Sequence, residues 1–251
     1  MTESSPRIAL FVTCLVDLMR PEIGFSALKL LEHAGCDVVV PDGQTCCGQP
    51  AYNAGDRGTA RQLAERVLGQ LEGYDYVVIP SGSCAGMIKV HYFDLFANDP
   101  EMKRRMADLE PKVFELTDFL VTVMKLTDVP GRLEGAITYH DSCSGLRELG
   151  VAAQPRALLA KIPGLTIKEM KDSRACCGFG GTFSMKYGNV STAIVDEKVN
   201  NIQATQAQAV VLGDLGCMLQ IEGRLRRLGD ERTQVLHVAQ VLAGELPPKS
   251  R

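Results

Sequence analysis

The sequence contains one cysteine pattern twice, and this duplication limits the possible folds more than any other feature. Cys-Cys-Gly occurs at residues 46–48 and again, 130 positions later, at residues 176–178. A single cysteine precedes each copy, with 31 or 32 residues between, and another follows it after 36 or 39. The pattern takes in eight of the nine cysteines: Cys14, Cys46, Cys47, Cys84, Cys143, Cys176, Cys177 and Cys217. Because internal repeats mark structural units, it predicts two similar lobes, residues 1–130 and 131–251.

The composition is that of a soluble globular protein, with 45% hydrophobic and 23% charged residues among 251. The net charge of −3 gives no electrostatic reason to expect nucleic acid as a partner. We expect no transmembrane segment, because no apolar run approaches the roughly 18 residues needed to cross a bilayer. The apolar segment 8–12 lacks the basic region and cleavage site of a secretory signal. We therefore expect a cytoplasmic protein that reaches a membrane only through partners.

Short apolar runs alternate with segments of helical periodicity along the chain. Strands are expected at residues 7–13, 37–41, 76–80, 136–140, 165–169 and 209–213, while 235–241 suits a strand or a helix. Helices are expected at 22–34, 56–71, 86–93, 100–109, 112–126 and about 155–161, and one capped by Ser191. This alternation predicts an α/β fold in which each lobe has a small parallel sheet flanked by helices. The patterned cysteines follow strand ends, where parallel sheets bind cofactors.

The thiols themselves indicate a metal site in each lobe. Disulfides are rare in the reducing cytosol, where cysteines bind metal, carry out redox chemistry or lie buried and inert. The inert role suits only Cys36, which lies outside the pattern. Four thiolates match the ligand count of a [4Fe-4S] cluster and also of structural zinc. Adjacent cysteines and long gaps favour an iron–sulfur cluster, one per lobe, with zinc and metal-free thiols as alternatives.

Five stretches of the sequence resemble the lactate-utilisation iron–sulfur subunit family: Phe11–Asp17, Thr45–Asn53, Pro80–Cys84, His140–Cys143 and Cys176–Phe183. That family shares the duplicated cysteine-rich CCG domain with a subunit of heterodisulfide reductase and with the glycolate oxidase iron–sulfur subunit. The resemblance spans nearly the whole chain. It implies an oxidoreductase component, an electron-transfer subunit of a complex that oxidises L-lactate to pyruvate. Other iron–sulfur subunits are the implied partners, and L-lactate is a candidate ligand.

The chain departs from the wider CCG pattern at one position in each half. The domain often ends in Cys-x-x-Cys, but the last positions here are Met87 and Gln220. The missing thiols weigh against the five-thiolate, non-cubane cluster associated with heterodisulfide reductase. Four remain in each half, enough for an ordinary cluster or for one with an open iron. A thiol–disulfide enzyme acting at its own cluster and a structural zinc module for assembly stay as alternative functions.

His140 and Asp141 stand just before Cys143 and are the candidate catalytic residues. The imidazole could move a proton during oxidation of a 2-hydroxy acid, with Asp141 orienting the ring. We favour the other interpretation, a hydrogen bond from His140 to cluster sulfur or to the loop backbone. Side chains that could hold a substrate carboxylate, but are more simply surface charges, are those of Arg20, Arg174 and Lys186. Asp17 is expected to cap the helix that follows Cys14.

Overall fold

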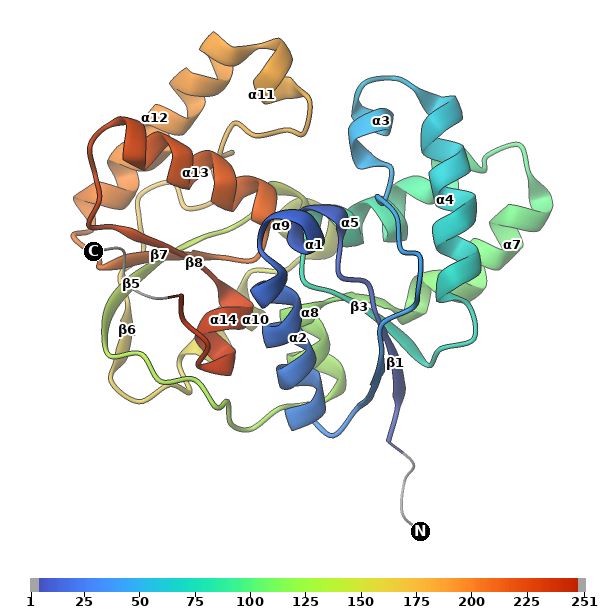
Figure 1. Cartoon of the computed structure of the whole chain (residues 1–251), viewed down its shortest axis with the longest axis horizontal. Helices are drawn as coiled ribbons and strands as arrows, with labels where there is room; N and C mark the ends of the chain where they lie inside the picture. Colours follow the sequence, from blue (N-terminus) through green and yellow to red (C-terminus); the bar gives the residue numbers. More distant parts are fainter. Residues whose placement is uncertain (1–4, 248–251) are drawn as a thin grey trace.

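A computed structural model, which describes residues 5–247, confirms the α/β architecture with two four-stranded parallel sheets (Figure 1). The first sheet has the order β2-β1-β3-β4, formed by Asp37–Val39, Arg7–Leu10, Tyr76–Ile79 and Val113–Glu115. The second has the matching order β6-β5-β7-β8, formed by Leu165–Ile167, Gly135–His140, Ala209–Leu212 and Gln234–His237. The strand registers also match, since Ile8 pairs with Tyr76 as Ile137 pairs with Ala209. Each lobe is therefore one copy of the same unit.

Helices connect the parallel strands, as such sheets require. In the first lobe they are α1 (Cys14–Met19), α2 (Pro21–His33), α3 (Gln49–Asn53), α4 (Arg57–Leu71), α5 (Gly82–Gly86), α6 (Tyr92–Leu95), α7 (Pro100–Leu109) and α8 (Leu116–Asp118), with short η1 (Met87–His91), η2 (Glu110–Lys112) and η3 (Phe119–Val123). In the second they are α9 (Cys143–Leu149), α10 (Ala153–Leu159), α11 (Phe183–Lys186), α12 (Gly188–Ala204), α13 (Leu215–Arg227) and α14 (Val238–Ala243). α1 and α9 begin at the first cysteine of their lobe, which places that thiol in a helical first turn.

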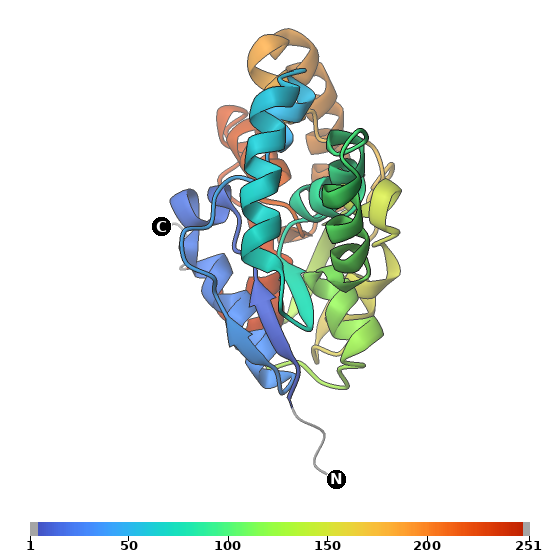
Figure 2. The ribbon, with the colours of Figure 1, turned by 90° about the vertical axis from the view of Figure 1, so that its right-hand side faces the viewer.

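Alternating side chains bury both faces of the first sheet. Ala9, Val77 and Ile79 pack with α4 and α7, which cover the outer face (Figure 2). Ile8, Leu10 and Val78 point the other way, as the period of two in a strand requires, and join a core that also contains the second sheet. The lobes therefore share one hydrophobic core, to which α2 and α14 contribute from either side. Residues 125–134 form no helix or strand, and the predicted lobe boundary, which stays a prediction, lies among them.

Three expectations were wrong in detail, three short helices were missed, and one open choice is resolved. The segment expected to be one helix at 112–126 begins with strand β4, an edge strand of only three residues. α1, α3 and α9 were missed, because helices of five to seven residues are too short to show a periodic pattern. Ser191 lies inside α12, and Asp17 lies inside α1 and does not cap α2. Segment 235–241 is neither strand nor helix alone, since β8 ends and α14 begins within it.

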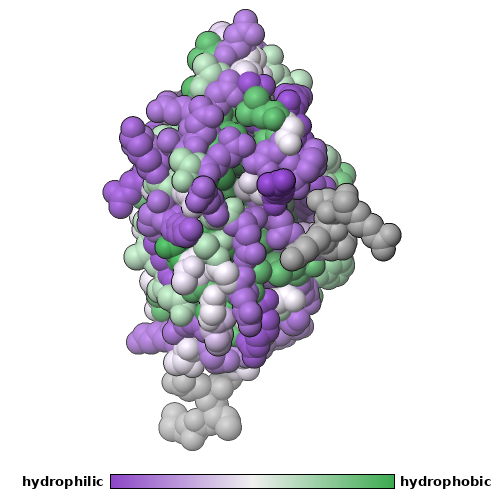
Figure 3. Space-filling view, turned by 90° about the vertical axis from the view of Figure 1, so that its left-hand side faces the viewer, coloured by the Kyte–Doolittle hydropathy of each residue, from purple (hydrophilic) through white to green (hydrophobic). Residues whose placement is uncertain are grey.

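The surface seen from the second lobe's side is mainly hydrophilic, with hydrophobic residues scattered over it (Figure 3). The helices α12 and α13 contribute to this side of the molecule (Figure 1). Within residues 5–247, no helix has the length and hydropathy that a bilayer crossing would need.

Candidate metal centres

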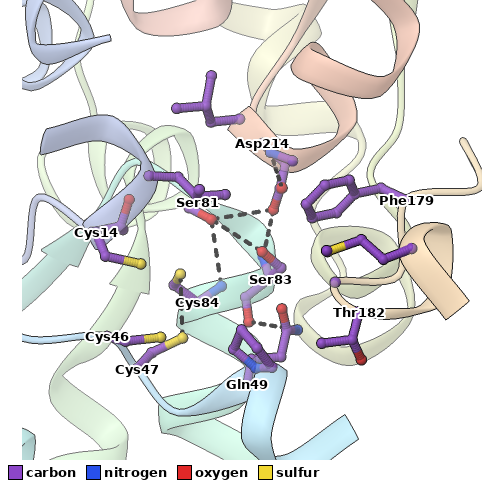
Figure 4. Close-up of a pocket in the computed structure, with 17 residues that line it drawn as sticks. Cys14, Cys46, Cys47, Gln49, Ser81, Ser83, Cys84, Phe179, Thr182 and Asp214 are labelled. Carbon is purple, nitrogen blue, oxygen red and sulfur yellow. Dashed lines mark hydrogen bonds between the residues drawn. The ribbon is translucent and has the colours of Figure 1, made fainter. Parts of the chain in front are cut away.

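The four patterned thiols of the first lobe meet at one point. Cys14 comes from the start of α1, Cys46 and Cys47 from the loop before α3, and Cys84 from α5, and their side chains converge (Figure 4). The sulfur atoms of Cys47 and Cys84 are 3.4 Å apart, and Cys46 accepts hydrogen bonds from Cys14 and Cys47. All four thiols are free. The loops at one edge of the sheet thus bring together the four cysteines that the repeated sequence pattern assigned to this lobe.

The second lobe repeats this arrangement with its own four thiols. The sulfur atoms of Cys177 and Cys217 are 3.0 Å apart, and Cys176 accepts hydrogen bonds from Cys143 and Cys177. Cys177 and Cys217 are buried, whereas Cys143 and Cys176 are partly exposed. We refer to the two sets as the first and second thiol sites.

In each thiol site, the glycine of the Cys-Cys-Gly loop packs against a long helix, α4 in the first lobe and α12 in the second. The backbone N–H of Gly48 donates to the sulfur of Cys46 at 3.4 Å, and that of Gly178 donates to Cys176 at 3.3 Å. Both glycines have φ near +85°, which a side chain would strain. A Cβ on Gly178 would also lie 2.7 Å from the Ser191 carbonyl oxygen. Glycine therefore allows the loop to lie against α12 while its amide supports a negatively charged sulfur.

Hydrogen bonding among the thiols concentrates negative charge on one sulfur per site. Hydrogen bonds from Cys14 and Cys47 hold the pKa of the Cys46 thiol well below its usual range, and the hydrogen bond to Cys46 raises the pKa of Cys14. In the second site the pKa of Cys176 falls and that of Cys143 rises for the same reason. Further thiolates would repel one another without a cation. Each site therefore fits a metal or cluster whose binding releases thiol protons.

Asp214 links the two sites across the lobe interface. Its carboxylate accepts hydrogen bonds from the Ser81 hydroxyl at 3.2 Å and the Ser83 N–H at 2.8 Å, both at the start of α5. It also accepts from the Gly216 N–H, which caps its own helix α13. One buried side chain therefore caps the two helices that carry Cys84 and Cys217.

A cavity adjoins each thiol site. The one beside the first site has about 220 Å³ and also borders Phe179, Thr182 and Met185 from the opposite lobe (Figure 4). The one beside the second site has about 90 Å³. Both are bordered by Gln49, Ser83, Phe179, Gly181 and Asp214, which separate the two thiol sites. Within residues 5–247, no Arg, Lys or His is among the side chains that line either cavity.

His140 and Asp141 do not form the pair expected between them. The Asp141 carboxylate is held by both terminal nitrogens of Arg156, at 2.7 and 3.0 Å. His140 is fully buried, and a ring nitrogen lies within 4.8 Å of the sulfurs of Cys177 and Cys217. Neither ring nitrogen has a hydrogen-bond partner among the described residues, although the Ser173 carbonyl is nearby. Burial, with the positive charge of Lys198, lowers the pKa of His140 to about 3.

Lys198 is a site residue that the sequence analysis missed. It lies on α12 with 1% of its surface exposed, and its ammonium group donates to the carbonyls of Asp172 and Ser173 at 2.6 and 3.1 Å. The thiols of Cys177 and Cys217 lie near enough for their charge to raise its pKa, against the larger lowering effect of burial. Helical spacing could have found it, because Val195, Val199 and Ile202 on the same helix are also buried.

The other candidates lie apart from the thiols. Arg20 makes an ion pair with Glu222 at 3.2 Å, while Arg174 and Lys186 are exposed. Met87 is buried in η1, and the Gln220 amide donates to the Ser191 hydroxyl at 2.8 Å. Cys36 lies in the hydrophobic core. The eight patterned cysteines are thus the thiols that the fold gathers, and their role as ligands remains a prediction.

Comparison with known proteins places this architecture in a family. Residues 8–89 and 137–222 match the family described as "Cysteine-rich domain" (CCG). The chain is 45% identical to lactate utilization protein A of Geobacillus kaustophilus and 42% identical to lactate utilization protein A 2 of Bacillus cereus, over 94% of this chain and 98% of each relative. Its fold is similar to the crystal structure of a hypothetical protein from Helicobacter pylori, with a TM-score of 0.70 at 14% identity over 99% of this chain and 52% of that one. The chain therefore belongs to the lactate utilization protein A family and contains two CCG cysteine-rich domains.

Proposed function

We propose that this chain is the iron–sulfur electron-transfer subunit of a complex that oxidises L-lactate to pyruvate. Each thiol site would hold one cluster, of the [4Fe-4S] type, through its four cysteines. Support for the pathway comes from the names of the relatives, which assign them to lactate utilization. Support for the electron-transfer role comes from the two convergent sets of four free thiols, one in each lobe.

The observation that carries the proposal is the charge of the side chains that line the two cavities. A 2-hydroxy acid is held through its carboxylate, which proteins bind with arginine or another cation. Among residues 5–247, the side chains lining either cavity include no cation. Asp214 adds a negative charge to both cavities, and this charge would repel the carboxylate of lactate. The sites thus suit a bound redox group better than they suit lactate, so we place lactate oxidation on partner subunits.

The residues of each site have separable roles in holding such a group. A cluster supplies reversible one-electron storage when it is bound. The four cysteines are the ligands, and the N–H groups of Gly48 and Gly178 stabilise charge on Cys46 and Cys176. Asp214 fixes the helix starts that carry Cys84 and Cys217. Oxidation of lactate releases two electrons and two protons, and other iron–sulfur subunits are the proposed partners that exchange these electrons.

The alternatives from the sequence remain testable. A structural zinc module would use the same thiols, and contact between Cys177 and Cys217 at 3.0 Å also suits a thiol–disulfide enzyme. Anaerobic purification followed by iron, sulfide and zinc analysis separates them. We expect a brown protein whose visible absorption bleaches with dithionite. A colourless protein with stoichiometric zinc, or one active in disulfide exchange without metal, would refute the proposal.

Two matched variants test whether there is one cluster per lobe. We expect Cys47→Ser and Cys177→Ser each to lose about half the iron, because each removes a ligand from one site only. Cys36→Ser is the control, since Cys36 lies in the core away from both sites, and it should keep all the iron. Loss of all iron from either ligand variant would show that the lobes share a single cluster.

A further inference from the structure

The two thiol sites have matching cysteines but different neighbours. The overlay that pairs Cys14 with Cys143 also pairs Phe11 with His140, at the ends of β1 and β5. Both side chains are fully buried. The first lobe therefore has a benzyl group where the second has an imidazole with a nitrogen within 4.8 Å of two cysteine sulfurs.

A second difference lies on the helix that follows each Cys-Cys-Gly loop. Gly48 packs on Ala60 and Leu63 of α4, and Gly178 packs in the same way on Ser191 and Ile194 of α12. This equivalence places Lys198 opposite Val67. Val67 is fully buried in the apolar core, whereas Lys198 brings a buried ammonium group to the second site.

The remaining polar groups do not offset this difference. Asp214 borders both cavities and so acts on both sites. Asp141 is paired with Arg156, which it shares with the half-exposed Glu169, so the guanidinium offsets much of its charge. In the first lobe, Tyr92 approaches the thiols, but its hydroxyl donates to the Cys47 carbonyl oxygen at 2.9 Å. Only the second site therefore combines a buried cation with a buried imidazole that has no hydrogen-bond partner among the described residues.

We propose that His140 and Lys198 make the second thiol site the one that holds an added electron more tightly. Reduction adds negative charge to an iron–sulfur group, and hydrogen bonds to its sulfurs and nearby positive charge favour the reduced form. A ring nitrogen of His140 lies within 4.8 Å of the sulfurs of Cys177 and Cys217 and would offer a hydrogen-bond donor to the sulfur of a group bound there. The ammonium group of Lys198, held by two carbonyls, supplies the charge.

This inference rests on the proposed iron–sulfur function. It adds a direction of electron transfer, from the first thiol site to the second. One electron delivered to the chain by a partner would reside on the group held by Cys143, Cys176, Cys177 and Cys217. If the electron arrived at the first site, that site would pass it to the second, losing one electron as the second gains one. The relevant property is the difference between two reduction potentials, which can be measured without lactate turnover.

The test uses protein with one site disabled, so that each potential is read alone. Cys47→Ser leaves the second site, and Cys177→Ser leaves the first. Redox titration followed by electron paramagnetic resonance should give the higher potential for the second site. Adding His140→Phe should weaken reduction of the second site about tenfold, a shift of about 59 mV for one electron. Lys198→Met should shift it in the same direction, whereas the exposed control Lys186→Met should not.

The reciprocal change guards against simple misfolding. Phe11→His in the protein that retains the first site should raise that potential. His140→Asn keeps a hydrogen-bond donor and should recover part of the loss seen with His140→Phe. Loss of second-site iron in His140→Phe would indicate that the histidine is a ligand, and this would overturn the inference. A second-site potential unchanged by His140→Phe and Lys198→Met would overturn it as well. Absence of iron from both sites in the unaltered protein would instead overturn the proposed function, and this inference with it.

Discussion

At the scale of single residues, contact between thiols within each site has a consequence for the metal-free protein. The sulfurs of Cys47 and Cys84, and of Cys177 and Cys217, are already within 3.4 Å of each other. Cys36 is isolated in the core, and burial raises its pKa to about 11, so little of it is the reactive thiolate. The nine cysteines should therefore differ in their response to oxidants.

We expect mild oxidation of metal-free protein with diamide to form the disulfides Cys47–Cys84 and Cys177–Cys217 and to leave Cys36 reduced. Peptide mapping by mass spectrometry, with alkylation of free thiols, measures this. Protein loaded with metal before oxidation is the control and should be protected, since ligation occupies the thiolates. Predominant cross-linking through Cys36 would contradict the described arrangement.

Single residues also show what the sequence could and could not predict about the site. Cysteine spacing was sufficient to group the thiols, because each gap spans one strand–helix unit of the repeat. The difference between Phe11 and His140 was visible in the same overlay. Helical spacing could have placed Lys198 on the buried face of α12, but its ammonium group contacts the Asp172 and Ser173 carbonyls, which lie in an irregular loop. Spacing does not encode that contact.

At the scale of elements, the repeat extends beyond the two segments that match the CCG family. β4 and β8 occupy the same edge of their sheets, and each ends in a side chain that caps the next helix. Glu115 accepts from the Thr117 N–H at 2.7 Å, and His237 accepts from the Ala239 N–H at 3.2 Å. The family match ends at residues 89 and 222, before these two strands, and the caps differ in chemistry, since one is a carboxylate and the other is an imidazole.

Glu115 gives this capping element a pH dependence. Burial raises the pKa of Glu115 from 4.5 to about 7. Between these pH values the folded protein keeps the proton while the unfolded chain releases it, so the free energy of unfolding falls as pH rises through this range. The full loss is about 3 kcal/mol.

Glu115→Gln should remove this contribution. Chemical denaturation at pH 5 and pH 7.5 measures it, with the unaltered protein as reference. We expect the variant to gain stability relative to the unaltered protein at the higher pH, because the amide side chain that replaces the carboxyl group cannot ionise. An equal difference between the two proteins at both pH values would show that Glu115 ionises normally.

At the scale of the whole molecule, the lobes meet through close contact of α5 and α9. The Gly82 N–H donates to the Gly213 carbonyl at 3.3 Å, and a Cβ on Gly82 would lie 2.9 Å from the Gly145 Cα. Backbone therefore packs on backbone at the interface. Because both helices carry a patterned cysteine, this contact fixes how the two thiol sites lie relative to each other.

Gly82→Ala should separate these helices and destabilise the protein by about 1–3 kcal/mol through overpacking. Gly223→Ala in α13 is the matched control, since no atom lies within 4 Å of its added Cβ. Replacing glycine inside a helix without a clash should stabilise the control by up to about 1 kcal/mol. Thermal denaturation compares them, and equal stability of the two variants would contradict the close contact.

Because both lobes belong to one polypeptide, the surroundings of each thiol site can change independently. In a symmetric dimer of a single lobe, every substitution would appear around both thiol sites at once. Here residues 11 and 140 are separate positions of one chain, so phenylalanine and histidine can occupy equivalent places in the same molecule. Covalent fusion thus preserves the shared geometry of a symmetric pair while allowing each half its own chemistry.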